Sequence, residues 1–178
     1  MKPKLNSLLF LCALSLLVVA KASAQFSAGA ELGLPMGNFS DVSNTGLGVS
    51  LRYEANIQDK LNWTASIGYL SFGGKPYLGG SFGNVSAIPL AGGIKYYLNK
   101  AGDGLYLAGD LGINFISYSV AFPNQGSGNG VTFASANTTR VGLSPGVGYR
   151  IKNWDFTGRF NLVSDFTYLG LRAAYVFP

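Results

Sequence analysis

The sequence lacks histidine altogether and contains a single cysteine among its 178 residues. Without histidine, the Ser-His and His-Asp pairs used by common hydrolases cannot form. No cluster of cysteine and histidine exists to hold a transition metal, and one cysteine forms no intrachain disulfide. We therefore predict that the protein is not an enzyme and carries no metal or other cofactor.

Charge is also scarce. Only 12% of residues are charged, against roughly 25% in an average soluble domain. Hydrophobic residues reach 48%, aromatic residues 13%, and glycine occurs 25 times. This composition is unusual for a soluble enzyme and is typical of a β protein that has many turns and an apolar exterior.

The one long apolar run lies at the N-terminus and has the features of a secretory signal peptide. Lys2 and Lys4 precede the apolar segment Leu8–Ala20, and the small residues Ala22–Ala24 follow it. A transmembrane anchor is the alternative, but a spanning helix needs ~20 apolar residues. We expect cleavage after Ala24.

This division assigns residues 1–24 to the signal peptide and residues 25–178 to a single β-barrel domain. The signal segment holds Cys12 and three of the 13 basic residues. Basic and acidic residues nearly balance in the remaining chain, so the sequence gives no support for nucleic-acid binding.

Beyond the signal segment, apolar and polar residues alternate with a period of two, which predicts β-strands. The alternation is clearest in residues 47–69, where two unbroken runs flank a short turn. Eight strands are predicted: 26–34, 47–57, 61–69, 85–98, 105–115, 140–151, 154–162 and 169–177. The long connections 35–45, 71–84 and 119–137 alternate with short ones until the last two, which are both short. This order is typical of an antiparallel meander, and no helical period appears after residue 24.

Two closed barrels fit this period. A soluble, lipocalin-like barrel has its apolar face inside, whereas a membrane barrel has it outside. A solvated exterior is normally much richer in Lys and Glu than the polar face here, while a narrow lumen needs small residues and charges that pair. We therefore predict an all-β, eight-stranded antiparallel up-and-down transmembrane β-barrel. The predicted lumen charge network comprises Glu31, Arg52, Glu54, Lys95, Asp110, Arg140, Arg150, Asp155, Arg159 and Arg172.

The aromatic residues favour the same interpretation, because they gather near both ends of the strands, as in the interfacial belts of membrane barrels. Ordinary core aromatics of a β-sandwich are the alternative. The predicted membrane-interface residues are Tyr53, Trp63, Tyr69, Tyr96, Phe115, Tyr149, Trp154, Tyr175 and Phe177. Phe72, Tyr118, Phe166 and Tyr168 also lie near the long-loop end. Pro89 and Pro145 fall inside strands, so we expect a bulge or strand end near each.

Eight strands enclose a lumen that side chains fill, which disfavours a wide pore. Three interpretations stay open: an envelope scaffold whose loops serve interaction or adhesion, a narrow porin-like channel for ions or small solutes, and a soluble periplasmic barrel. Binding residues often lie on loops. Five aromatic residues of the predicted loops either contact a partner or surface glycan from an exposed position, or pack on the barrel rim or at the lipid headgroups: Phe39, Tyr77, Phe82, Phe122 and Phe133.

Three segments, 88–98 (IPLAGGIKYYL), 105–115 (LYLAGDLGINF) and 169–177 (LGLRAAYVF), together with the signal ending ASAQ, carry a family resemblance. The mature chain resembles the small eight-stranded outer-membrane β-barrel proteins of the OmpA-transmembrane-domain and OmpX-like group, and most of all the porin-family barrel-domain proteins of Bacteroidota. The resemblance implies the cell outer membrane of a Gram-negative bacterium. It implies contact with outer-membrane lipid and lipopolysaccharide, and with the barrel-assembly machinery that reads a terminal aromatic residue. Here Phe177 is followed by Pro178. An extracellular partner would bind through the loops.

Overall fold

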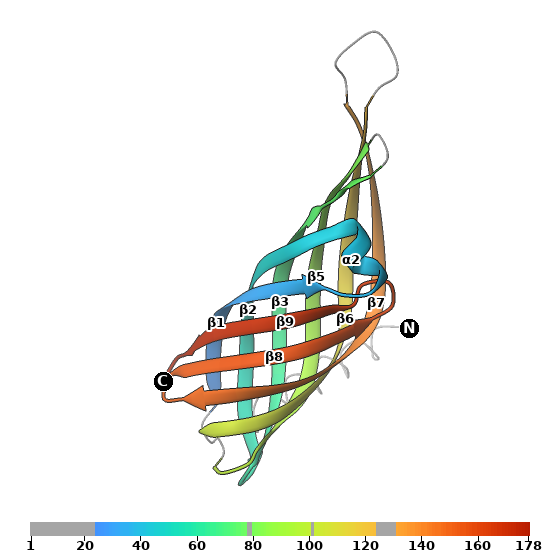
Figure 1. Ribbon diagram of the computed structural model, residues 1–178. Helices are drawn as coiled ribbons and strands as arrows, with labels where there is room; N and C mark the ends of the chain where they lie inside the picture. The colour runs from blue at the N-terminus through green and yellow to red at the C-terminus, as the bar shows by residue number, and fades with distance from the viewer. Residues whose placement is uncertain (1–23, 78–79, 101, 124–130) are drawn as a thin grey trace, which may run out of the picture.

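The computed structural model describes residues 24–77, 80–100, 102–123 and 131–178, and they form one β-barrel (Figure 1). Its elements in chain order are β1 Gln25–Pro35, α2 Asn38–Val42, β2 Ser43–Gln58, β3 Leu61–Gly74, β4 Pro76–Tyr77, β5 Gly80–Tyr97, β6 Gly104–Pro123, β7 Val131–Ile151, β8 Trp154–Val163 and β9 Tyr168–Val176.

Antiparallel pairing between neighbours closes the sheet into a ring. The order is β3-β2-β1-β9-β8-β7-β6-β5-β4, and an additional β3–β5 pairing joins the two ends. The two-residue strand β4 pairs only with the start of β5, so eight strands form the barrel wall. The first and last strands, β1 and β9, lie side by side, with Glu31 opposite Arg172. The predicted eight-stranded antiparallel barrel is confirmed.

The alternation of side chains separates the two faces of the wall. On β2, Leu51 is 59% exposed on the outer surface, whereas its neighbour Arg52 is 1% exposed inside. Every other barrel strand likewise presents large apolar side chains outward and polar side chains inward. A soluble barrel would have the reverse arrangement. The wall is therefore that of a transmembrane-type barrel.

The nine predicted interface aromatics all project from the outer face. Seven of them are between two-fifths and half exposed. Tyr53 and Trp63 are less exposed because each ring packs on a neighbour, with centroids 5.1 Å apart, and Phe26 packs on Tyr53 from the other side at 5.0 Å. Phe26 is outward-facing and 61% exposed, so it extends this row of rings at the short-turn end.

Several strands are longer than the sequence pattern predicts, and all of them extend at the same end. The predicted loops 71–84 and 119–137 are largely strand, and β6 still pairs with β7 at Ser119↔Ser135 and beyond. Figure 1 shows β5, β6 and β7 rising above the rest of the barrel. Backbone pairing needs no apolar face, so a hairpin can continue after the alternation that marks the apolar belt has stopped.

The predicted loop 35–45 also differs from the structure, because it contains the short helix α2. Five residues are too few to show a helical period, so the pattern could not reveal it. Ser40 donates its backbone N–H to the Gly37 carbonyl at 2.9 Å, and Lys75 Nζ reaches the Ser40 carbonyl at 2.5 Å. In the described part of the chain, no helix is long and apolar enough to cross a membrane.

The bulges predicted at the two prolines are absent. Pro89 pairs with Asn114 in regular register on the β6 side. On the β3 side, pairing is interrupted between Ile67↔Leu90 and Leu70↔Ala87 and resumes in the same register. Pro145 behaves in the same way, since the β7–β8 pairing skips only from Leu143↔Leu162 to Gly146↔Arg159. A proline lacks one N–H, and these interruptions are confined to one neighbouring strand each.

Candidate functional site: the charged lumen

The first layer of the lumen, nearest the short turns, is built around Lys95. This side chain is fully buried, and its Nζ donates to Glu54 Oε2 at 2.8 Å and to Asp155 Oδ2 at 2.5 Å. Arg150 lies 3.9 Å from Glu54 Oε1 and donates to Gln25 Oε1 at 2.5 Å. Two cations and two carboxylates, from β2, β5, β7 and β8, therefore balance one another within this layer.

Neutral side chains supply further hydrogen bonds to the carboxylates of this first layer. Tyr97 donates its hydroxyl to Glu54 Oε1 at 2.7 Å, and Asn62 Nδ2 donates to the same oxygen at 2.6 Å. Tyr106 donates to Asp155 and places its ring 4.4 Å from Lys95 Nζ. The predicted lumen charge network did not include these three residues. Their positions carried a signal, because Tyr97 lies two residues after Lys95 and hence on the same face of its strand.

The second layer is a chain of arginines and carboxylates halfway along the barrel. Asp110 Oδ2 accepts from Arg52 Nη2 at 2.9 Å and from Arg159 Nη1 at 3.2 Å. Arg159 Nη2 donates to Glu31 Oε1 at 2.7 Å, and Arg172 Nε lies 3.8 Å from the same oxygen. The five groups come from β1, β2, β6, β8 and β9, so they meet only in the closed barrel.

Hydroxyl groups supply further partners for the second layer. Arg172 Nε donates to Ser50 Oγ at 2.8 Å, and Arg172 Nη2 donates to Ser27 Oγ at 3.0 Å. Thr64 donates to Asp110 Oδ1 at 3.2 Å. These bonds matter because a buried ion pair is stable only when the remaining donors and acceptors also find partners.

The structure brings nine of the ten predicted lumen charges together, and all nine are buried. Arg140 is the exception. It is exposed, and no ion pair joins it to another described charge. Pairing between β7 and β8 begins only at Gly142, so Arg140 lies on the hairpin extension beyond the end of β8. The alternation placed Arg140 on the correct face of β7, but it could not show that the wall ends before this position.

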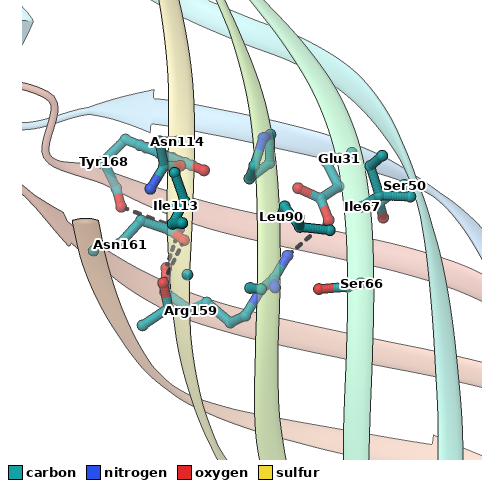
Figure 2. Close-up of a pocket in the computed structure, with 16 residues that line it drawn as sticks. Glu31, Ser50, Ser66, Ile67, Leu90, Ile113, Asn114, Arg159, Asn161 and Tyr168 are labelled. Atoms are coloured by element: carbon teal, nitrogen blue, oxygen red, sulfur yellow. Dashed lines mark hydrogen bonds and ion pairs between the residues drawn. The ribbon is translucent and has the colours of Figure 1, made fainter. Parts of the chain in front are cut away.

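A cavity of about 30 Å³ adjoins the second layer, and its lining is partly apolar, with Ile67, Leu90 and Ile113 (Figure 2). Glu31, Ser50, Ser66, Asn114 and Arg159 are among the polar side chains that line it. A space of this size holds one or two waters. It is too small for a hydrated solute to pass.

The opposite end of the lumen is closed by an apolar plug, which we define as the buried cluster Phe39, Leu70, Phe72, Val85, Ala87, Ile116, Val163, Phe166 and Tyr168. Phe39 sits on α2 and contacts Phe72 and Phe166, with ring centroids 5.1 and 4.5 Å apart. Of the positions expected for Phe39, its 2% exposure excludes the exposed one on a loop. Phe72, Phe166 and Tyr168 likewise face inward and do not belong to the interfacial belt. The side chains of Tyr77, Phe82, Phe122 and Phe133 lie outside the described residues.

Among the described residues, no group of three or more Asp, Glu, Cys or His side chains is arranged to hold a metal ion. Each buried carboxylate is bound by cations or neutral donors. The arrangement therefore fills and fastens the barrel.

Comparison of the sequence with protein-family models gives no match, and comparison with curated proteins gives none either. Comparison of structures gives clear similarities. Ail, the attachment invasion locus protein of Yersinia pestis, in complex with the heparin analogue sucrose octasulfate, superimposes with a TM-score of 0.58 at 14% identity, over 86% of this chain and 97% of that chain.

Two further structures agree. The Yersinia pestis outer membrane protein Ail in a phospholipid bilayer nanodisc gives a TM-score of 0.50 at 16% identity, over 86% of this chain and 98% of that one. Neisserial surface protein A gives 0.51 at 14% identity, over 87% and 96%. The chain has the fold of the small eight-stranded outer-membrane β-barrels. At these identities the likeness concerns the fold, and any role must be argued from the residues of this chain.

Proposed function

We propose that the protein is an outer-membrane barrel that acts as an envelope scaffold, presents its long hairpins for interaction or adhesion, and does not conduct solutes. The observation that carries this proposal is the filled lumen. Two layers of buried ion pairs occupy it from one end, and the apolar plug closes the other. The alternative is a narrow porin-like channel, which would need a continuous water path through the same layers.

The location is part of the proposal. We infer that residues 1–24 are a signal peptide cleaved after Ala24, because Lys2 and Lys4 precede the apolar segment Leu8–Ala20 and β1 starts at Gln25. The apolar outer face suits outer-membrane lipid and lipopolysaccharide, and Phe177 near the terminus suits the barrel-assembly machinery. The short turns would then face the periplasm and the long hairpins the cell exterior.

Planar-bilayer recording tests the closed lumen. Refolded residues 25–178 are expected to show no steady conductance in molar KCl, under conditions in which a general porin inserted from the same detergent conducts. The physical reason is that ions would have to displace fully buried, charge-paired side chains. Steady conductance that falls when Arg52 or Arg150 is replaced by glutamine would favour the channel and contradict the scaffold.

The chemistry of a hairpin partner follows from charge. Residues 76–94 and 115–139 contain no Asp, Glu, Lys or Arg. The described parts of these stretches form most of the raised β5–β6–β7 extension, on which Arg140 is exposed. The Ail structure holds a heparin analogue, which is a polyanion and is recognised best by clustered basic side chains. This extension has no such cluster. An uncharged, hydroxyl-rich partner such as a neutral glycan fits it better.

A variant with a shortened β6–β7 hairpin tests whether this hairpin binds a partner. Replacing residues 119–135 by Asn-Gly joins the paired residues Tyr118 and Ala136 through a two-residue turn. We expect the variant to fold with an unchanged urea midpoint, because the layers of the lumen lie below the cut. Binding to neutral glycans on an array should be lost. Equal binding by both proteins, or binding to sulfated glycans alone, would contradict the proposed partner chemistry.

A further inference from the structure

The two layers of lumen charges differ in their balance. The first layer pairs Lys95 and Arg150 with Glu54 and Asp155, two charges of each sign. The second layer sets three guanidinium groups, those of Arg52, Arg159 and Arg172, against the carboxylates of Glu31 and Asp110. Arginine does not lose its proton in proteins. One buried positive charge in the second layer is therefore uncompensated.

The same three arginines have unpartnered N–H groups. Arg52 Nε and Nη1, Arg159 Nε and Arg172 Nη1 are buried and have no hydrogen-bond acceptor among the described residues. A buried donor without a partner is costly, more so when it is charged. The second layer is thus short of both negative charge and acceptors, whereas the first layer is short of acceptors alone, at Arg150 Nε and Nη1.

A cavity of fitting size adjoins this layer. It measures about 30 Å³, and Arg159, Ser50 and Ser66 line it (Figure 2). Ser50 Oγ accepts from Arg172 Nε, so the hydroxyl proton of Ser50 is free to donate into the cavity. Ser66 lies opposite Arg52 in the β2–β3 register. The cavity therefore offers two hydroxyl donors beside the Arg159 guanidinium group, in space for about one monatomic ion.

We propose that this cavity binds one small inorganic anion, of the size and charge of chloride. The anion neutralises the excess positive charge and accepts from Arg159 Nε and from the hydroxyl groups of Ser50 and Ser66. Glu31 also lines the cavity, but its carboxylate is bound by Arg159 at 2.7 Å and approached by Arg172 at 3.8 Å. Two cations thus shield the one negative wall, and the site is a structural anion site that fastens the middle of the barrel.

The direct test is a crystal of residues 25–178 grown with sodium bromide as the halide source. An anomalous difference peak is expected inside the cavity. In solution, urea unfolding of the same protein is compared in chloride and in gluconate at equal ionic strength. At 100 times its Kd, the anion lowers the ratio of unfolded to folded protein about 100-fold, so the midpoint should rise with chloride.

Three variants make the test specific. Arg172→Gln removes the excess charge, and Ser66→Ala removes only a donor. Both should abolish the bromide peak and the chloride effect, whereas the exposed Arg140→Gln should keep both. If the Arg172→Gln variant does not refold, the bromide peak and the chloride effect of the Ser66→Ala variant alone test the proposal. Equal wild-type midpoints in the two salts, or bromide bound only elsewhere, would overturn the proposal and leave water as the occupant of the cavity.

Discussion

Replacing Lys95 with methionine is expected to lower the free energy of unfolding by about 3–5 kcal/mol, the usual cost of breaking a buried ion pair by removing one partner. Lys95 Nζ bonds Glu54 at 2.8 Å and Asp155 at 2.5 Å, deep inside the first layer. Without this ammonium group, two buried carboxylates face each other, and Arg150, 3.9 Å from Glu54, is the cation that remains within the first layer.

The measurement is urea unfolding in lipid vesicles, followed by the change in electrophoretic mobility between folded and unfolded barrels. Lys100→Met is the matched control, because Lys100 is exposed at a short turn, and its change should stay within about 0.5 kcal/mol. Adding Glu54→Gln to Lys95→Met should recover part of the loss by removing one uncompensated charge. A Lys95→Met midpoint equal to that of Lys100→Met would contradict the central role assigned to Lys95.

Replacing Phe72 with alanine is expected to lower the free energy of unfolding by about 3–5 kcal/mol, as for large-to-small changes in a packed core. The Phe72 ring is fully buried in the apolar plug and meets Phe39, Phe166 and Tyr168 edge-on at 5.1–5.5 Å between centroids. Gly46 lies directly beneath it, and a Cβ there would come within 2.5 Å of the ring. The absence of a side chain at Gly46 therefore leaves the space that the Phe72 ring fills.

Tyr69→Ala provides the comparison for Phe72→Ala, measured by the same unfolding assay. Tyr69 is on the same strand but points to the outer face and is 48% exposed. Lipid replaces the lost ring there, so no cavity forms and the cost should be clearly smaller. If the two variants are equally destabilised, the apolar plug is not a packed core. Phe72→Ala should also loosen α2, which protease cleavage near Asp41 would detect.

The sequence predicted the barrel wall because one physical rule governs every strand. Side chains alternate across a strand, and a membrane barrel must keep its charges away from lipid. Arg52, Glu54, Lys95 and Asp110 therefore fall inside wherever the alternation holds. The rule is local, which explains its success in the hairpin 47–69, where the predicted and observed strands differ only at their ends.

The same rule gave wrong predictions where the position of a residue along the barrel axis matters, because alternation carries no information about that position. Phe72 and Tyr69 are both aromatic and three residues apart, and the pattern alone suggested an interfacial position for both. Their opposite faces follow from strand parity, but the inward plug exists only because the wall and α2 enclose it. Arg140 is a second example. The alternation placed it on the correct face of β7, but it lies beyond the last residue of β8 and therefore outside the closed wall.

The amino-acid sequence by itself determined which face of each strand is apolar, and with it the number of barrel strands and the inside-out character of the barrel. These properties depend on neighbours two residues apart in the chain. Only the tertiary structure decided which charges pair, since Lys95 and Asp155 are 60 residues apart and Arg159 and Glu31 128 apart. Register and closure set those distances. They also gave the second layer three arginines for two carboxylates, the imbalance from which the anion site is inferred.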